Sequence, residues 1–174
     1  MACLLTTGNA LDCLDSLSGI KEVLLGNFSE ITAFTEAAGE ITAITQAGVT
    51  SFYRYELEQE DADLLTTENR STENGSLFYE TVLNFTIDKL SKEKSEELRI
   101  MAQARKLVAI VELADGQFVA MGFDRGAMKQ GGTNQMATGK AYGDKQGYTI
   151  GLSCKESHYP YFVTSGVVAG LTIA

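Results

Sequence analysis

The sequence predicts a mainly β protein, an antiparallel β-sandwich or barrel with one flanking α-helix. Three observations favour this fold. Glycine occurs 17 times and proline once, so glycine makes the turns, as suits long β-hairpins. Several segments rich in β-branched residues lie between turns that contain glycine. One segment repeats with a period of two, as a half-buried strand does.

The length of the chain limits the number of domains, and its charge limits the partners that it can bind. The 174 residues, 44% of them apolar, suit a single β-rich domain over 1–174. The net charge of -9 repels polyanions and disfavours nucleic-acid binding through a basic patch, while DNA can pass an acidic wall without adhering. No stretch approaches the about 18 apolar residues of a membrane span, and the N-terminus lacks the pattern of a secretory signal. We expect no membrane partner and synthesis in the cytoplasm.

The first strands are predicted between residues 20 and 45. Residues 20–28 are predicted to form a strand that ends in a Gly-Asn turn. Residues 31–35 and 40–45 are rich in isoleucine and threonine and are separated by Ala-Ala-Gly, which predicts a strand pair.

The clearest alternation lies between Ser76 and Asp88. One face of this segment carries Leu77, Tyr79, Thr81, Leu83, Phe85 and Ile87. We expect residues 51–60 to pair with it in a long hairpin over 51–88. The polar, acidic segment 61–75 between them is predicted to be an extended loop.

Residues 91–106 no longer alternate with the period of two seen in the strands. Their spacing predicts the single helix of the chain. Ser91 is a suitable N-cap, and acidic residues lie near the start of the segment while Arg105 and Lys106 lie near its end. The charged side chains of this helix are interpreted as a solvated face rather than a binding stripe.

The remaining strands follow the helix. Residues 107–113 and 117–122 flank Ala-Asp-Gly, a strong hairpin signal. A stretch rich in Gly, Asn and Gln over 126–143 precedes a predicted strand at 147–156, and a final apolar strand is expected over 161–173.

The residue types of a catalytic site are sparse. His158 is the single histidine and lies in a predicted turn, where a surface or partly packed side chain is expected rather than a catalytic one. The glycine-rich segments lack the Lys-Ser/Thr ending of a phosphate-binding loop. We expect a non-enzymatic protein with no catalytic residues and no cofactor.

Metal binding is also disfavoured. Cys3, Cys13 and Cys154 are odd in number, lack zinc-ligand spacing and are expected to be free thiols. The acidic residues of 56–63 lack the order of a calcium loop. We expect no metal site.

Several segments together carry a family resemblance. They are Ser18-Gly19-Ile20-Lys21, Phe52-Tyr53-Arg54-Tyr55-Glu56, Asn74-Gly75-Ser76-Leu77-Phe78-Tyr79-Glu80, the helix, 107–116, 139–149 and Glu156. This order, which covers nearly the whole chain, resembles small virion proteins of tailed phages that infect Bacteroidetes. Within such particles, a β-sandwich with a flanking helix and a long hairpin is similar to the tail-tube proteins.

The resemblance implies a structural subunit of the virion, made in the host cytoplasm. Tail-tube subunits form stacked rings whose hairpins join edge to edge around a lumen, and an extended loop contacts the next ring. Carried onto this chain, the assembly hairpin would use Phe52, Tyr53, Tyr55, Leu77, Tyr79, Leu83 and Phe85. The lumen would be lined by Glu56, Glu58, Glu80 and Asp88. The implied partners are further copies of the chain, other virion proteins and genomic DNA that passes without specific binding.

Two other classes stay open. The chain could be another virion component, such as a capsid decoration, a connector or a tail-completion protein. It could also be an unrelated binding module or an enzyme, in which case the net charge of -9 would serve only solubility.

Overall fold

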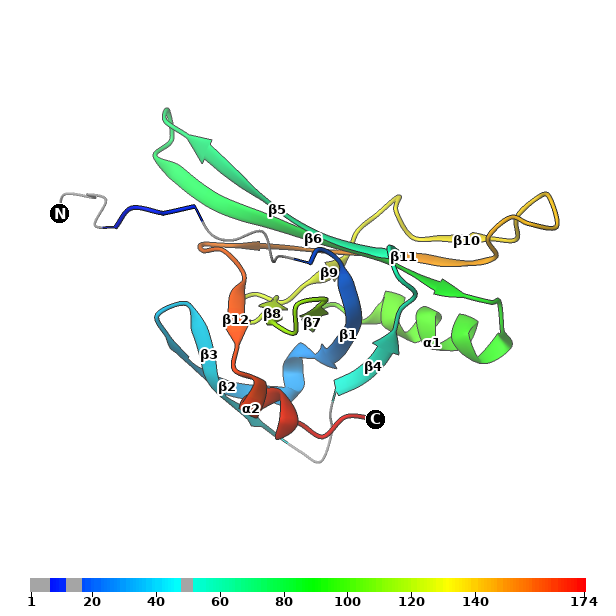
Figure 1. The fold of residues 1–174 in the computed structure, drawn as a ribbon, viewed down its shortest axis with the longest axis horizontal. Coiled ribbons are helices and arrows are strands. Elements are labelled where there is room, and N and C mark those ends of the chain that lie inside the picture. Colours follow the sequence, from blue (N-terminus) through cyan, green and yellow to red (C-terminus); the bar gives the residue numbers. More distant parts are fainter. Residues whose placement is uncertain (1–6, 12–16, 48–51) are drawn as a thin grey trace.

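The protein is described by a computed structural model covering residues 7–11, 17–47 and 52–174. Cys3, Cys13 and Ser51, named above, lie outside the described residues. The mainly β prediction is confirmed, because the described chain forms one seven-stranded and one five-stranded sheet, mostly antiparallel. Figure 1 shows the smaller sheet lying across the larger one as a second layer.

The seven-stranded sheet has the order β2-β3-β12-β8-β7-β1-β4, and its neighbours are antiparallel except for β12 and β3. Its strands are β1 (Ile20–Asn27), β2 (Ile31–Ala37), β3 (Glu40–Gln46), β4 (Phe52–Glu56), β7 (Leu107–Leu113), β8 (Phe118–Met121) and β12 (Tyr161–Val163). A short 3-10 helix, η1 (Phe28–Glu30), joins β1 to β2. The strands predicted over 20–45 and the hairpin around Asp115-Gly116 are therefore confirmed. The predicted Gly-Asn turn is wrong, because Gly26 and Asn27 are paired residues of β1.

The five-stranded sheet has the order β10-β11-β6-β5, with β9 also paired to β11. Its strands are β5 (Ala62–Ser71), β6 (Ser76–Asp88), β9 (Met128–Lys129), β10 (Gln135–Ala137) and β11 (Gly147–Glu156). The predicted strands 76–88 and 147–156 are confirmed, and they pair with each other over ten residues, from Gly147↔Asp88 to Glu156↔Tyr79.

The expected hairpin partner of β6 is wrong. β6 pairs with β5, from Ala62↔Phe85 to Ser71↔Ser76, whereas β4 pairs with β1 in the other sheet. The segment 61–75 is therefore a strand and a tight turn, not an extended loop. Polar residues hid this strand because only its inward-facing positions, such as Leu64, need to be apolar when the other face is solvated.

The predicted final strand over 161–173 is also wrong beyond its first residues. After β12 the chain turns into a short helix, α2 (Ser165–Ala169), which buries Val168. The end of the chain then returns beside β4, where the Phe52 amide donates to the Thr172 carbonyl at 3.0 Å. An apolar run with small residues does not distinguish a strand from a short buried helix.

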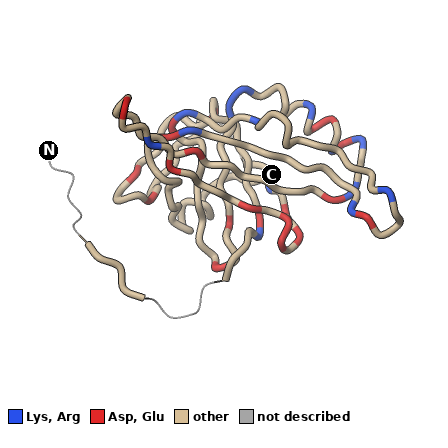
Figure 2. Tube along the Cα trace, turned by 90° about the horizontal axis from the view of Figure 1, so that it is seen from above, with Lys and Arg blue, Asp and Glu red and all other residues tan. Residues whose placement is uncertain are grey.

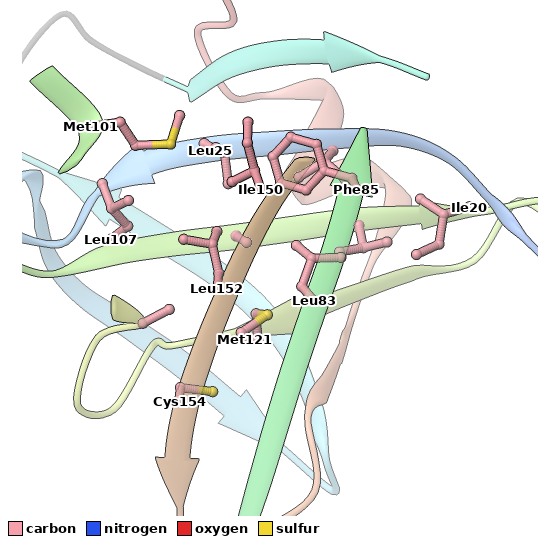
Figure 3. Close-up of a cluster of buried hydrophobic side chains, with 14 residues drawn as sticks. Ile20, Leu25, Leu83, Phe85, Met101, Leu107, Met121, Ile150, Leu152 and Cys154 are labelled. Atoms are coloured by element: carbon pink, nitrogen blue, oxygen red, sulfur yellow. The ribbon is translucent and has the colours of Figure 1, made fainter. Parts of the chain in front are cut away.

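The core between the two sheets is built by the alternation of β6 and β11. Leu83, Phe85, Ile150 and Leu152 point from the smaller sheet toward β1 and β7 of the larger one (Figure 3). Each of these four side chains is at most 1% exposed. Helix α1 (Lys92–Gln103) adds Met101 to this core.

Helix α1 begins as predicted. The side chain of Ser91 accepts a hydrogen bond from the Lys94 amide at 3.1 Å, which satisfies one of the unpaired donors at the helix start. The helix packs at one end of the two layers in Figure 1. It flanks the sandwich without covering the outer face of the smaller sheet.

A second core lies on the other face of the seven-stranded sheet. It contains Leu24, Ile41, Phe52, Val108, Ile110, Ala120, Phe123, Val163 and Val168. Here the curved β2–β3 hairpin and α2 supply the cover. The larger sheet is thus buried on both sides, while the smaller sheet has one buried face.

The two faces of the smaller sheet predict different costs for truncating a leucine. Leu83 is 0% exposed on the inner face, so L83A should lower the free energy of unfolding by about 2–5 kcal/mol. Leu65 is 61% exposed on the neighbouring strand, so L65A should change it by less than about 0.5 kcal/mol. Urea unfolding of the monomer measures both; similar losses in the two variants would contradict the assigned faces.

Candidate functional site

The outer face of the smaller sheet is a strand-built surface that no described layer covers. On β6 it consists of Phe78, Glu80, Val82, Asn84, Thr86 and Asp88. All six are exposed or half-buried, whereas Thr81, Leu83 and Phe85 between them are buried. Thr133 lies against Gly151 at one place on this face. Most side chains on this face are polar, several of them threonines, as is typical of a sheet face exposed to water rather than of one packed in a core.

The charges on this face are partly neutralised by neighbours. Glu80 lies 3.6 Å from the Lys155 ammonium, and Asp88 lies 3.3 Å from the ammonium of Lys145. Figure 2 shows acidic and basic residues interspersed along the described chain. The face therefore offers no cluster of free cations that would hold a polyanion.

The structure separates the four residues expected to line a lumen. Glu80 and Asp88 share the outer face of β6, as their spacing predicts. Glu56 ends β4 in the other sheet, and Glu58 lies in the short connection between β4 and β5. Sequence spacing placed all four on one hairpin only because β4 was taken as the partner of β6.

The seven residues expected to form the assembly hairpin are also divided. Phe52, Tyr53 and Tyr55 belong to β4, and Phe52 is buried in the second core. Burial raises the pKa of Tyr55 to about 12, with a smaller effect of Glu97. The other four belong to β6: Leu83 and Phe85 are buried, Tyr79 is half-buried beside Tyr159, and Leu77 is 49% exposed. The buried members cannot contact a second copy.

Strand β5 forms one edge of the smaller sheet, and no described strand pairs with its outer side. The Thr86 amide donates to the Asp61 carbonyl at 3.1 Å, which fixes the phase of the β5–β6 hydrogen bonds. Odd-numbered residues of β5 direct their amide and carbonyl groups toward β6. The groups directed outward belong to Ala62, Leu64, Thr66, Glu68 and Arg70. Sequence analysis missed this edge because it treated the segment as a loop.

The opposite side of the sheet is formed by two short strands, and the chain just before β9 is joined to the larger sheet, because Ala127 and Leu107 exchange backbone hydrogen bonds. β9 and β10 both pair with β11, and the segment Gln130–Asn134 separates them. Gln130 donates its amide to the Gly151 carbonyl at 2.8 Å, and the Asn134 side chain accepts from the Gly151 amide at 3.2 Å. These bonds hold the interrupted edge in line with the sheet.

The β5–β6 hairpin extends beyond the rest of the molecule. Figure 1 shows its turn projecting past the seven-stranded sheet. Gly75 supports the turn with a φ of 60°, a conformation that favours glycine. The projecting part carries Leu77, which is 49% exposed.

His158 joins the two sheets at the link between β11 and β12. Its Nε2 lies 2.6 Å from an Asp124 carboxylate oxygen, its Nδ1 lies 2.7 Å from the Tyr159 carbonyl, and its ring stacks on Tyr161 at 4.0 Å. Burial alone would lower the pKa of His158, but these two acceptors outweigh it and raise the pKa above its usual value. The expected partly packed histidine is what the structure shows.

The Glu156 carboxylate and the Cys154 thiol are buried close to His158 in the sequence. Glu156 is 3% exposed and accepts from the Asp124 amide at 3.2 Å. Burial, with the nearby charge of Glu156, raises the pKa of the Cys154 thiol to about 12. Cys154 therefore stays a neutral thiol at neutral pH and is a poor nucleophile.

A surface hollow of about 480 Å³ lies between the β2–β3 turn, the β7–β8 turn and the start of α2. Its charged lining residue, Glu40, already accepts a hydrogen bond from the Thr164 hydroxyl at 2.9 Å. Across the described ranges, no group of three or more His, Cys, Asp or Glu residues is placed to hold a metal ion. Within the same ranges, no helix is both long and apolar enough to cross a membrane.

Comparison with protein-family models, with curated proteins and with solved structures found no match. The outer face, its two edges and the projecting hairpin are thus characterised by their own geometry. Together they form an extended surface that no other described part of the protein covers.

The contacts of His158 predict a pH dependence of stability. Because its pKa is raised on folding, its contribution is complete below the ordinary value of about 6.5 and is lost as pH rises through the raised value. Urea midpoints of the wild type should fall between about pH 6 and pH 8 by more than those of H158Q. Equal pH dependence in the two proteins would contradict this coupling.

Proposed function

We propose that the chain is a structural subunit of a tailed-phage virion, of the tail-tube type, which assembles into stacked rings around a DNA-conducting channel. The observation that supports this most is the smaller sheet, which combines an uncovered polar face with a ten-residue edge strand, β5, that has no described partner on its outer side. Exposed edges of this kind invite pairing with another chain. Ordered assembly would satisfy those backbone groups.

Strand directions favour a closed ring. β10 is antiparallel to β11, β11 to β6, and β6 to β5, so β10 and β5 run in opposite directions at the two edges. Copies related by rotation could therefore join β5 to the opposite edge of the next copy in an antiparallel manner. Such a heterologous contact closes into a ring when the rotation permits it, and closure leaves no free edge.

The chemistry of the outer face is compatible with DNA that slides past it. The net charge of -9 repels phosphates, and the lysines on this face are near acidic partners. Threonine and asparagine side chains would present a hydrated wall. In the proposed ring, Glu80 and Asp88 would face the lumen, whereas Glu56 and Glu58 would not be part of that wall.

Negative-stain electron microscopy of the purified full chain tests this proposal. Rings or tubes with a central hole are expected. A monomer or small oligomer that binds capsids would instead favour a decoration, connector or tail-completion protein. Turnover of a small molecule without any assembly would favour the enzyme class.

A proline at the free edge should separate assembly from folding. Thr66 directs its amide outward, so T66P should keep the β5–β6 hydrogen bonds but remove a donor needed at the seam, reducing rings and tubes to monomers. The control T66V loses only the hydroxyl that is 3.0 Å from the Thr81 hydroxyl and should still assemble. Microscopy measures the particles and circular dichroism the fold; rings formed by a folded T66P would count against edge pairing.

A further inference from the structure

Strand β5 carries one large exposed apolar side chain, Leu65, on a face that is otherwise polar. Leu65 is 61% exposed, and its neighbours on that face are Asp63 and Thr67. The backbone groups of the even-numbered residues of β5 point away from β6 and have no described partner strand. A second strand laid along this edge would satisfy the backbone groups and cover the leucine together.

The edge is able to pair with a copy of itself. Two antiparallel copies of one strand are related by a two-fold axis, which places one residue opposite the same residue of the second copy. Even-numbered residues then always meet even-numbered residues, so the outward backbone groups of the two copies face each other in every such register. The part of β5 toward its turn projects beyond the seven-stranded sheet (Figure 1), which leaves room alongside it for the second copy. The side chains decide which residue lies at the axis.

Charge excludes some of these registers. An axis near the middle of β5 gives the longest overlap, which limits the choice to residues 64–68. With Glu68 at the axis, two copies of its carboxylate would lie opposite each other. With Leu64 at the axis, Glu60 would lie opposite Glu68. Like charges directly opposite each other destabilise an antiparallel pair, so both registers are disfavoured.

Hydrophobic contact selects among the three registers that are left. An axis at Thr66 would place Leu65 opposite Thr67. An axis at Thr67 would place it opposite Asn69. An axis at Leu65 itself places two leucines opposite each other and removes both from water, which stabilises the pair.

We propose that the unassembled chain forms a two-fold dimer in which β5 pairs antiparallel with β5 of a second copy, with the two Leu65 side chains in contact at the axis. Leu65 directs its backbone groups toward β6, so the two leucines form a pair without hydrogen bonds between the copies, the kind whose side chains lie closest. Leu64 and Thr66 on either side exchange backbone hydrogen bonds with Thr66 and Leu64 of the second copy. Exposed Arg70 lies next to exposed Glu60 of the second copy, which adds opposite charges at both ends of the contact.

This inference goes beyond the proposed ring, because it concerns the chain before assembly. A free β5 edge invites aggregation, and the dimer covers that edge in solution. The proposed ring uses the same edge, so the dimer has to open before a subunit joins a ring.

A single cysteine at the axis tests the dimer. In full-length protein with Cys3→Ser and Cys13→Ser, L65C should form one disulfide between two copies, because opposite residues in a pair without hydrogen bonds have Cα atoms about 4.5 Å apart, within the range of a disulfide. Mild oxidation and a non-reducing gel should show a covalent dimer and nothing larger. Cys154 stays in all variants because it is buried.

Two matched variants in the same background test the register. Asp63 of one copy should face Thr67 of the other, on the same outer face as Leu65. D63C alone and T67C alone should therefore stay monomeric on the gel, whereas the two proteins, mixed under reducing conditions and then oxidised, should form a covalent dimer. Cross-linking of T67C alone as strong as that of L65C, or a mixture that does not cross-link, would overturn the proposed register.

Sedimentation and microscopy separate the dimer from the ring. Dilute wild type should sediment as a dimer, and L65D should sediment as a monomer, since it places two carboxylates opposite each other. A wild type that remains monomeric, or rings without a covalent dimer from L65C, would refute the dimer and leave the ring assembly to its own test. Covalent dimers with no rings in the wild type would refute the ring alone. Oxidised L65C dimers that form rings only after reduction would support both.

Discussion

The strand β6 sets the constraint on which the rest of the structure depends. Its 13 residues alternate between a face buried against β1 and β7 and a face that no described layer covers. Its neighbours β5 and β11 must then be amphipathic in the same sense, because a slip of one residue would expose Leu83 and Phe85. One sheet therefore closes the core and at the same time presents a solvated surface.

The same strand pairing decides which backbone groups are left unpaired at the edges of the sheet. Amide and carbonyl groups of β5 that point away from β6 have no partner strand among the described residues, which leaves them open to water or to another chain. From β10 to β5 the sheet is four strands wide and antiparallel throughout, so β10 and β5 run in opposite directions, which suits repeated joining of identical copies. These two properties support the proposed ring, in which the polar outer face would be the inner wall.

Local patterns in the sequence predicted where the strands lie better than they predicted which strands pair with each other. Alternation identified β6, β-branched residues identified β2 and β3, and Asp115-Gly116 identified the β7–β8 turn. Periodicity cannot state which distant strand lies alongside, so β4 was paired with β6 instead of β1. The candidate surface was recognised only in part, because β5 is polar on its outer face and its Leu65 is a single apolar residue there.

Amide-resolved hydrogen exchange of the monomer and of the assembled protein tests the central claim most directly. In the monomer, the amides of Leu65 and Thr67, bonded to β6, should exchange slowly, while those of Leu64, Thr66 and Glu68 should exchange quickly. Assembly through the β5 edge should slow the exchange at Leu64 and remove the alternation around it. An assembled particle in which the outward amides of β5 all still exchange as in the monomer would contradict the account.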